Sequence, residues 1–225
     1  MKRLSIAIDG PAGAGKSSVS KMLAARLGYA YLDTGAMYRA VTYKAMKNGL
    51  TGEEEIAAMA SKLDMEVQPG KDSMHVIVDG EDVTPFLRTP EVSGHVSAVS
   101  AIGGVRTAMV EIQRRQAEKG GIVLDGRDIG TVVLPKADVK IFLTASVHTR
   151  ALRRWKEMQA AHPEMTLEEI EADVSKRDYM DSHREISPLQ QAEDAKLLDN
   201  GEMTLEETAK AMISICEEKF PGFEK

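Results

Sequence analysis

The chain has 225 residues, of which 43% are hydrophobic and 28% charged, ordinary values for a globular domain with a sizeable core. A single cysteine, Cys216, excludes a disulfide framework and a zinc site built on cysteine pairs, and no apolar run reaches the ~18 residues of a membrane-spanning helix. The net charge of −6 lies entirely in residues 185–225, which disfavours a nucleic-acid partner, whereas the neutral remainder can still hold a basic site for a small anion.

Strand-like and helix-like segments alternate along most of the chain, which predicts an α/β fold with a parallel sheet covered by helices. In the first part, strands are predicted at residues 4–8 and 29–32, and helices at 17–27, 35–47 and 53–63. The first of these helices has apolar residues at helical spacing and is followed by Gly28, a typical C-terminal cap.

Residues of about 64 to 90 break this alternation. Segments 65–67 and 74–78 alternate apolar and polar residues, and Gly70 and the pair 79–80 supply turn residues. An all-β patch within an α/β chain predicts a small subdomain over the main sheet.

The α/β alternation then resumes. Strands are predicted at 121–125, 139–143 and 196–199, and helices at 105–118, 149–161, 167–179 and 204–219. Thr204 with Glu207 three positions later is a capping-box pattern that opens the last helix.

Residues 10–17 read GPAGAGKS and match the phosphate-binding P-loop pattern G-x-x-x-x-G-K-[ST] between a predicted strand and a predicted helix. Backbone N–H groups of such a loop converge on phosphate oxygens, and the helix N-terminus adds its positive dipole end. Lys16 is predicted to reach the outer phosphates and Ser17 to bind Mg²⁺. The predicted nucleoside-triphosphate site comprises Gly10, Pro11, Ala12, Gly13, Ala14, Gly15, Lys16, Ser17 and Ser18.

The P-loop does not specify an activity, because GTPases, ATPases and small-molecule kinases share it. A GTPase would carry an Asn-Lys-x-Asp motif, and the nearest string, residues 135–138, lacks the Asn. Asp125, at the end of a predicted strand, is either the acidic group near Mg²⁺ or the residue that opens the turn with Gly126.

Arginines recur near the predicted strand ends and on the later helices. They are Arg39, Arg127, Arg150, Arg153, Arg154, Arg177 and Arg184. Ligands of open parallel sheets bind at the carboxyl ends of the strands, so Arg127 is predicted to face Lys16. Guanidinium forks match phosphate oxygens, and more arginines than one triphosphate needs indicate a second, phosphorylated ligand.

Plainer interpretations stay open for several residues. Residues 150, 153 and 154 could form a solvated helix face, and Asp181 with Arg184 a surface pair. Arg114 and Arg115 are expected on the surface, the five histidines are expected to be structural, and Cys216 is expected in the core.

A phosphorylated acceptor is already anionic, so its phosphorylation needs no general base. Catalysis would then consist of positioning and charge neutralisation by Lys16, Mg²⁺ and the arginines. Such an enzyme must exclude water, and we interpret helix 149–161, followed by the polar turn 162–163, as a closing lid.

Several stretches in this order resemble bacterial cytidylate kinases. They are residues 8–17 (IDGPAGAGKS), 32–39 (LDTGAMYR), 125–133 (DGRDIGTVV) and 177–189, with its Arg177, Asp178, Asp181, Arg184, Pro188 and Leu189. The resemblance covers about residues 4 to 218. It implies in-line transfer, with Mg²⁺, of the ATP γ-phosphate to CMP or dCMP.

The resemblance also implies the nucleoside-monophosphate kinase fold. Its parts would be a P-loop core with a five-stranded parallel sheet at 1–63, 104–148 and 185–225, a small β-rich monophosphate-binding insertion at about 64–103 and a helical lid at about 149–184.

Carried over by position, the resemblance assigns roles to single residues. Thr34, where the family often has Ser, Tyr38 and Arg39 match the acceptor-binding stretch, and Ser97, Arg106 and Asp128 match the cytosine-reading positions. Arg127 and Arg184 match phosphate contacts, and Arg177 and Asp181 match sugar contacts. Arg150, Arg153 and Arg154 match the lid region on the ATP side. The predicted catalytic set is Lys16, Arg127, Arg150, Arg154 and Arg184, with Arg153 in ATP binding.

Two other functions stay open: a related kinase for another acceptor such as UMP, and a nucleotide-dependent switch that phosphorylates nothing. Because the apolar segment 4–8 is too short for a signal peptide, we expect a cytoplasmic protein, and we expect it to act as a monomer on small nucleotides.

Overall fold

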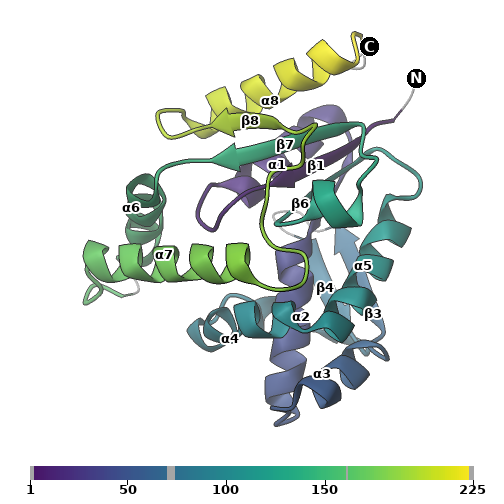
Figure 1. Ribbon diagram of the computed structural model, residues 1–225, viewed down its shortest axis with the longest axis vertical. Coiled ribbons are helices and arrows are strands. Elements are labelled where there is room, and N and C mark those ends of the chain that lie inside the picture. Colours follow the sequence, from purple (N-terminus) through teal and green to yellow (C-terminus); the bar gives the residue numbers. More distant parts are fainter. Residues whose placement is uncertain (1–2, 70–73, 161, 223–225) are drawn as a thin grey trace.

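Five parallel strands form the central sheet of the computed structural model, which describes residues 3–69, 74–160 and 162–222 (Figure 1). The spatial order of the strands is β2-β6-β1-β7-β8. Their bounds are β1 (Ser5–Asp9), β2 (Ala30–Asp33), β6 (Ile122–Gly126), β7 (Val139–Thr144) and β8 (Lys196–Asp199). Because every strand pair is parallel, all five carboxyl ends lie at one edge of the sheet. The predicted α/β fold with a five-stranded parallel sheet is confirmed.

Both faces of this sheet are buried, so the strands read as apolar runs. On one face Ile6 and Ile8 pack with residues of α1 (Lys16–Leu27) and α8 (Leu205–Lys219), where Cys216 is buried as expected. On the other face Ala7 and Leu124 pack with residues of α2 (Thr34–Lys47) and α5 (Gly103–Ala117). The alternation of side chains along β1 therefore divides the core into two layers.

The β-structure predicted after residue 64 is confirmed as a three-stranded antiparallel sheet of β3 (Met65–Pro69), β4 (Met74–Val78) and β5 (Glu81–Asp82), although Gly70 lies outside the described residues. The helix α3 (Glu53–Ala60) precedes this sheet, and the short turn η1 (Thr84–Phe86) follows it.

The helix α4 (Pro90–Ala101) was not predicted, so a description of the 64–103 segment as β-rich is incomplete. Its sequence is rich in Val and Ser and contains Gly94, and these residues favour helices weakly. Thr89 caps its first turn, and its buried Val96 and Val99 belong to the same core as α2, so tertiary packing stabilises it.

Two helices, α6 (Val147–Met158) and α7 (Leu167–His183), pack as a pair around Ala151, Ile170 and Val174. In Figure 1, α7 lies between the sheet and the lower part of the molecule that contains α2 and α4. Position 161, the predicted end of the first of these helices, lies outside the described residues. A capping box opens α7, and the predicted Thr204–Glu207 box opens α8. In the described parts of the chain, no helix has both the length and the apolar character needed to cross a membrane.

A five-residue π-helix, η2 (Ile129–Val133), follows the end of β6 and was not predicted either. Arg114 donates from Nε to the carbonyl of Val133 at 3.0 Å and from Nη2 to the carbonyl of Val132 at 2.7 Å. Both Arg114 and its neighbour Arg115 are exposed, as expected, but the first of them stabilises this turn.

Gly10 begins the P-loop directly after β1 and beside the neighbouring strand β7, and no other residue fits there. Its φ is 148°, and a Cβ atom would lie 1.9 Å from the carbonyl oxygen of Leu143. We expect Gly10→Ala to lower the free energy of unfolding by about 3 kcal/mol, measured by urea denaturation, because β7 must shift.

Gly94→Ala in α4 is the matched control, since nothing lies within 4 Å of its added Cβ. The helix should gain about 1 kcal/mol from this change. Equal effects of the two substitutions would contradict the argument.

Candidate active site

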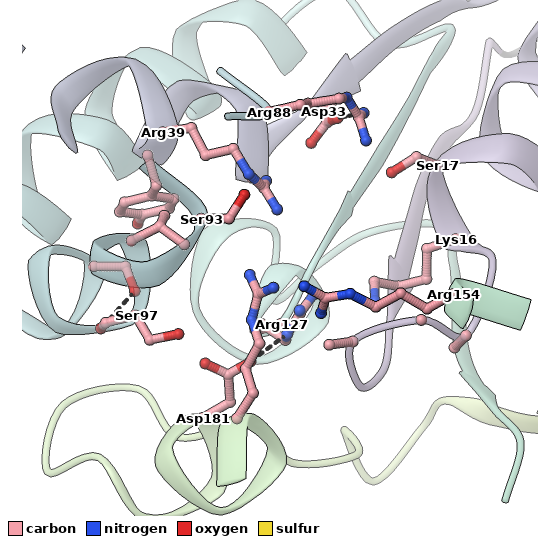
Figure 2. A pocket seen from close by; sticks show the side chains of 18 of the residues that line it. Lys16, Ser17, Asp33, Arg39, Arg88, Ser93, Ser97, Arg127, Arg154 and Asp181 are labelled. Carbon is pink, nitrogen blue, oxygen red and sulfur yellow. Dashed lines mark hydrogen bonds and ion pairs between the residues drawn. The ribbon is translucent and has the colours of Figure 1, made fainter. Parts of the chain in front are cut away.

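A cavity of about 930 Å³ opens at the carboxyl edge of the sheet. Every predicted site residue lines it except Gly10, Pro11 and Arg150. Figure 2 shows Lys16 and Arg154 on one side, which we call the P-loop side. Arg39 and Ser97 lie on the opposite side, which we call the α4 side, and Arg127 and Asp181 lie between the two. Segments far apart in the sequence therefore meet at one edge of the sheet, as expected for an open parallel sheet.

On the P-loop side, Lys16 is buried and folded back over its own loop. Its Nζ donates to the carbonyl oxygens of Gly10 and Pro11, both at 2.7 Å. Burial lowers the pKa of Lys16, and the charge of Arg127 lowers it further. An anion in the cavity would favour the charged ammonium and compete with these two carbonyls.

Oxygen atoms gather around Asp125 at the end of β6. Its Oδ2 accepts from Ser17 Oγ at 3.1 Å, its Oδ1 from Tyr31 OH at 2.8 Å, and its carbonyl from Thr34 Oγ1 at 2.7 Å. Burial raises the pKa of Asp125, and the charge of Asp33, opposite it on β2, raises it further. A hydroxyl and a carboxylate at this distance are the hard oxygen ligands that Mg²⁺ prefers, so these residues fit that ion.

Arg127 and Asp181 join the turn after β6 to α7. Arg127 Nε donates to Asp181 Oδ2 at 2.7 Å. Burial acts to raise the pKa of Asp181, but the charges of Arg127, Arg177 and Arg184 outweigh it and hold the pKa below its usual range. The alternative in which Asp181 and Arg184 form a surface pair is therefore wrong, because the buried Asp181 pairs with Arg127. Arg184 Nη2 instead lies 3.5 Å from Asp128 Oδ1.

A second buried ion pair closes the α4 side of the cavity. Arg106 on α5 donates to Asp128 Oδ2, and its Nη1 donates to the carbonyl of Ser100 at 3.2 Å. The same guanidinium lies over the ring of Tyr38, 5.4 Å from its centre. Ser97 lines the cavity in this corner. Three elements thus bring together the residues that the resemblance assigns to cytosine.

Four guanidinium groups that line the cavity keep a buried N–H without a hydrogen-bond partner among the described residues. The atoms are Arg39 Nε, Arg106 Nε, Arg177 Nε and Arg184 Nη2. An unsatisfied buried donor costs about 1–3 kcal/mol, so native structures seldom keep several in one place without a ligand. These donors indicate a binding site for an acceptor-rich molecule.

The three arginines of α6 have different surroundings, so they are not one solvated face. Arg150 is 4% exposed and donates to the carbonyls of Ala145 and Ala12, both at 2.9 Å, and it pairs with Asp178 at 2.6 Å. It thus ties the P-loop to α7 from outside the cavity lining. Arg153 and Arg154 line the cavity, where they contact Asn200 and Asp173, respectively.

Arg88 and Asp33 line the cavity and were not predicted as site residues. Arg88 Nη2 lies 3.4 Å from Asp33 Oδ2, and its side chain is 72% exposed. Figure 2 shows the pair across the cavity from Asp181. Asp33, the last residue of β2, carried a detectable signal, because ligands meet strand ends. Arg88 carried none, because it lies between a hairpin and an unpredicted helix.

Solved structures with the same architecture include two shikimate kinases. The one from Bacteroides thetaiotaomicron aligns over 96% of this chain and 99% of its own, with a TM-score of 0.53 and 12% identity. The one from Acinetobacter baumannii, in complex with shikimate, aligns over 98% and 96%, with a TM-score of 0.51 and 17% identity. These structures share the fold of this chain, and the P-loop between β1 and α1 places the chain in the class of P-loop nucleotide-binding proteins.

The family follows from the sequence comparisons. The family model described as cytidylate kinase matches residues 6–218. The protein named cytidylate kinase from Desulfitobacterium hafniense is 50% identical over 97% of this chain and 94% of its own. Its namesake from Bacillus subtilis is 47% identical over 97% and 98%. The chain belongs to the cytidylate kinase family.

Removing Arg106 should leave the buried carboxylate of Asp128 with only the longer ion pair to Arg184. We expect Arg106→Ala to lower the free energy of unfolding by about 3 to 5 kcal/mol in chemical denaturation. Arg115→Ala, on the exposed face of the same helix, should change it by less than about 0.5 kcal/mol. A small loss for Arg106→Ala would show that the pair does not hold this corner of the cavity.

Proposed function

We propose that this chain transfers the γ-phosphate of ATP to CMP or dCMP, giving CDP or dCDP and ADP. One observation carries the proposal: a single cavity joins a complete P-loop to a group of arginines whose buried N–H donors have no hydrogen-bond partner among the described residues. The P-loop suits the triphosphate donor, and the arginines of the α4 side suit a second ligand that carries a phosphate of its own.

The α4 side is the acceptor half of this proposal. Ser97, Arg106 and Asp128 take the cytosine edge, because their hydroxyl, guanidinium and carboxylate groups complement an amine, a ring nitrogen and a carbonyl. Thr34, Tyr38 and Arg39 bind the acceptor nucleotide near its phosphate. Arg127 and Arg184 take the acceptor phosphate, and Arg177 and Asp181 take the sugar.

The P-loop side is the donor half. Backbone N–H groups of residues 10–18 bind the ATP phosphates, and Lys16 exchanges its two carbonyl partners for phosphate oxygens. Arg153 and Arg154 approach the same phosphates from α6. Ser17, with Asp125 beside it, would hold Mg²⁺, which supplies neutralisation of the phosphate charge when bound.

Transfer in this arrangement needs no general base, because the attacking group is already a phosphate anion. The chain contributes alignment and positive charge, with Lys16 at the donor phosphates and Arg127 between donor and acceptor. Arg150 acts on the reaction by holding the P-loop through the carbonyl of Ala12. Neutralisation of the transferred group by several fixed cations lowers the barrier without proton transfer.

The proposal includes a division of labour along the chain. Residues 1–63, 104–148 and 185–225 form the core, residues 64–103 the acceptor-binding insertion, and residues 149–184 a lid whose closure excludes water. It also includes a monomeric enzyme in the cytoplasm, where ATP and free nucleotides are available.

A coupled ADP-release assay with ATP and Mg²⁺ tests the activity. Rates with CMP or dCMP should exceed rates with UMP or AMP, and ADP release without an acceptor should be slow. Equal ADP release with and without an acceptor would contradict the kinase. Faster turnover of UMP or AMP than of CMP would leave the kinase but contradict the assignment of the base.

Arg127→Ala should lower kcat with CMP by at least about 100-fold, because a preorganised donor to the transferred group is lost. The affinity for ATP, measured by calorimetry, should stay within about threefold, since ATP binds mainly through the P-loop. Arg115→Ala, an exposed arginine outside the cavity lining, is the control and should leave both values unchanged. A matching loss of ATP affinity would place Arg127 on the donor side.

A further inference from the structure

We propose that Asp9 is a positioning residue that sets the distance between the donor and acceptor halves of the cavity. This inference rests on the proposed phosphoryl transfer. Asp9 is outside the cavity lining and is only 5% exposed, so it acts through other residues. It is the last residue of β1, directly before the first glycine of the P-loop.

The carboxylate of Asp9 accepts two short hydrogen bonds from the start of η2. Its Oδ1 accepts from the N–H of Ile129 and its Oδ2 from the N–H of Gly130, both at 2.7 Å. The packing around these bonds is tight, because a Cβ atom on Gly130 would lie 3.3 Å from Oδ2 and 3.1 Å from Lys140 Cδ. One side chain therefore fixes two successive backbone amides.

These hydrogen bonds begin where the sheet stops holding the chain. The parallel pairing of β1 with β6 ends at the partners Asp9 and Gly126, so the next residues, Arg127 and Asp128, leave the ladder. Ile129 follows them directly. Arg127 and Asp128 therefore lie between the last pair of the sheet and the two amides that Asp9 holds, so the turn that directs them to the cavity is fixed at both ends.

Asp9 also frees Asp128 for the cavity. Asp128 occupies the N-cap position of η2, but its side chain makes no capping hydrogen bond and instead pairs with Arg106 and Arg184. Asp9 supplies, from a neighbouring strand, the acceptors that a cap residue would give. The side chain of Asp128 can therefore face the base-binding corner, while the first N–H groups of η2 keep hydrogen-bond acceptors in the carboxylate of Asp9.

The same residue is anchored on the donor side. The chain enters the P-loop through Gly10, which packs against the carbonyl of Leu143 and has little room to move. A rigid loop start on one side and two fixed amides on the other make Asp9 a short link between the halves. In-line transfer is sensitive to such spacing, since a displacement of about 1 Å can cost about 100-fold in rate.

Asp9→Asn tests the inference, because it keeps the size of the side chain but turns one acceptor toward an N–H as a donor. We expect kcat with CMP to fall at least about 30-fold. A loss of this size corresponds to a displacement of the reacting groups by a fraction of an ångström, because about 1 Å costs about 100-fold in rate. The affinities for ATP and for CMP, measured separately by calorimetry, should stay within about threefold, because each half of the cavity remains complete.

Asp138→Asn is the matched control. Asp138 Oδ2 accepts from Ser5 N at 2.9 Å and from Ser5 Oγ at 3.1 Å. Ser5 is the first residue of β1 and Asp9 the last, so the two carboxylates bind at opposite ends of the cavity-forming strand. Its substitution should lower the melting temperature while kcat stays within about twofold of the wild type. A purely structural role of Asp9 would give the same pattern for both variants.

Asp9→Glu decides the matter if Asp9→Asn does not fold. It keeps the charge and both acceptors but lengthens the link by one methylene, so kcat should fall with ATP affinity unchanged. Wild-type kcat in whichever of the two variants folds, or a parallel loss of ATP affinity, would overturn the inference. Failure of the wild-type chain to phosphorylate CMP would instead contradict the proposed function, so the two failures are distinct.

Discussion

The turn that follows β6 is the constraint on which the cavity depends. Asp125 faces Ser17 and Tyr31, Arg127 pairs with Asp181 on α7, and Asp128 pairs with Arg106 on α5. Three side chains within four successive residues thus connect the P-loop, the α6–α7 pair and the α4–α5 corner. The intervening Gly126 leaves no room for a side chain, because a Cβ atom would lie 2.6 Å from Thr34 Oγ1. Displacement of this turn would disturb every side of the cavity at once.

Crowded positive charge is the second feature of the cavity. Burial lowers the pKa of Arg177 to about 10, and the neighbouring charges of Arg127 and Arg39 contribute. Asp128 and Asp181 offset part of this charge, and the unpartnered N–H groups show that hydrogen bonding is incomplete as well. The net charge of −6 belongs to residues 185–225 and hides this local excess. Phosphate groups supply what the cavity lacks, namely negative charge and acceptor oxygens.

Local patterns made most of the fold predictable. An apolar strand, a helical spacing of apolar residues and the P-loop pattern each involve residues that are close together in the sequence. The predicted bounds of these elements therefore lie within a few residues of those in the structure. The helix α4, the turn η2 and the Asp9 link were missed because long-range contacts create them. α4 forms by packing on α2, and Asp9 reaches residues 129 and 130, about 120 positions later in the sequence, from the neighbouring strand. Among the site residues, Lys16 and Ser17 followed from the motif, whereas Ser97 and Arg106 came only from the family resemblance.

The central claim is that the arginines of the acceptor half exist to bind a phosphate. Calorimetric titration of the chain with CMP and with cytidine, at the same ionic strength, tests it most directly, because the two ligands differ only in that group. The account predicts that CMP binds at least about 100-fold more tightly, since two or more charge-assisted hydrogen bonds are gained. Equal affinity for CMP and cytidine would contradict it.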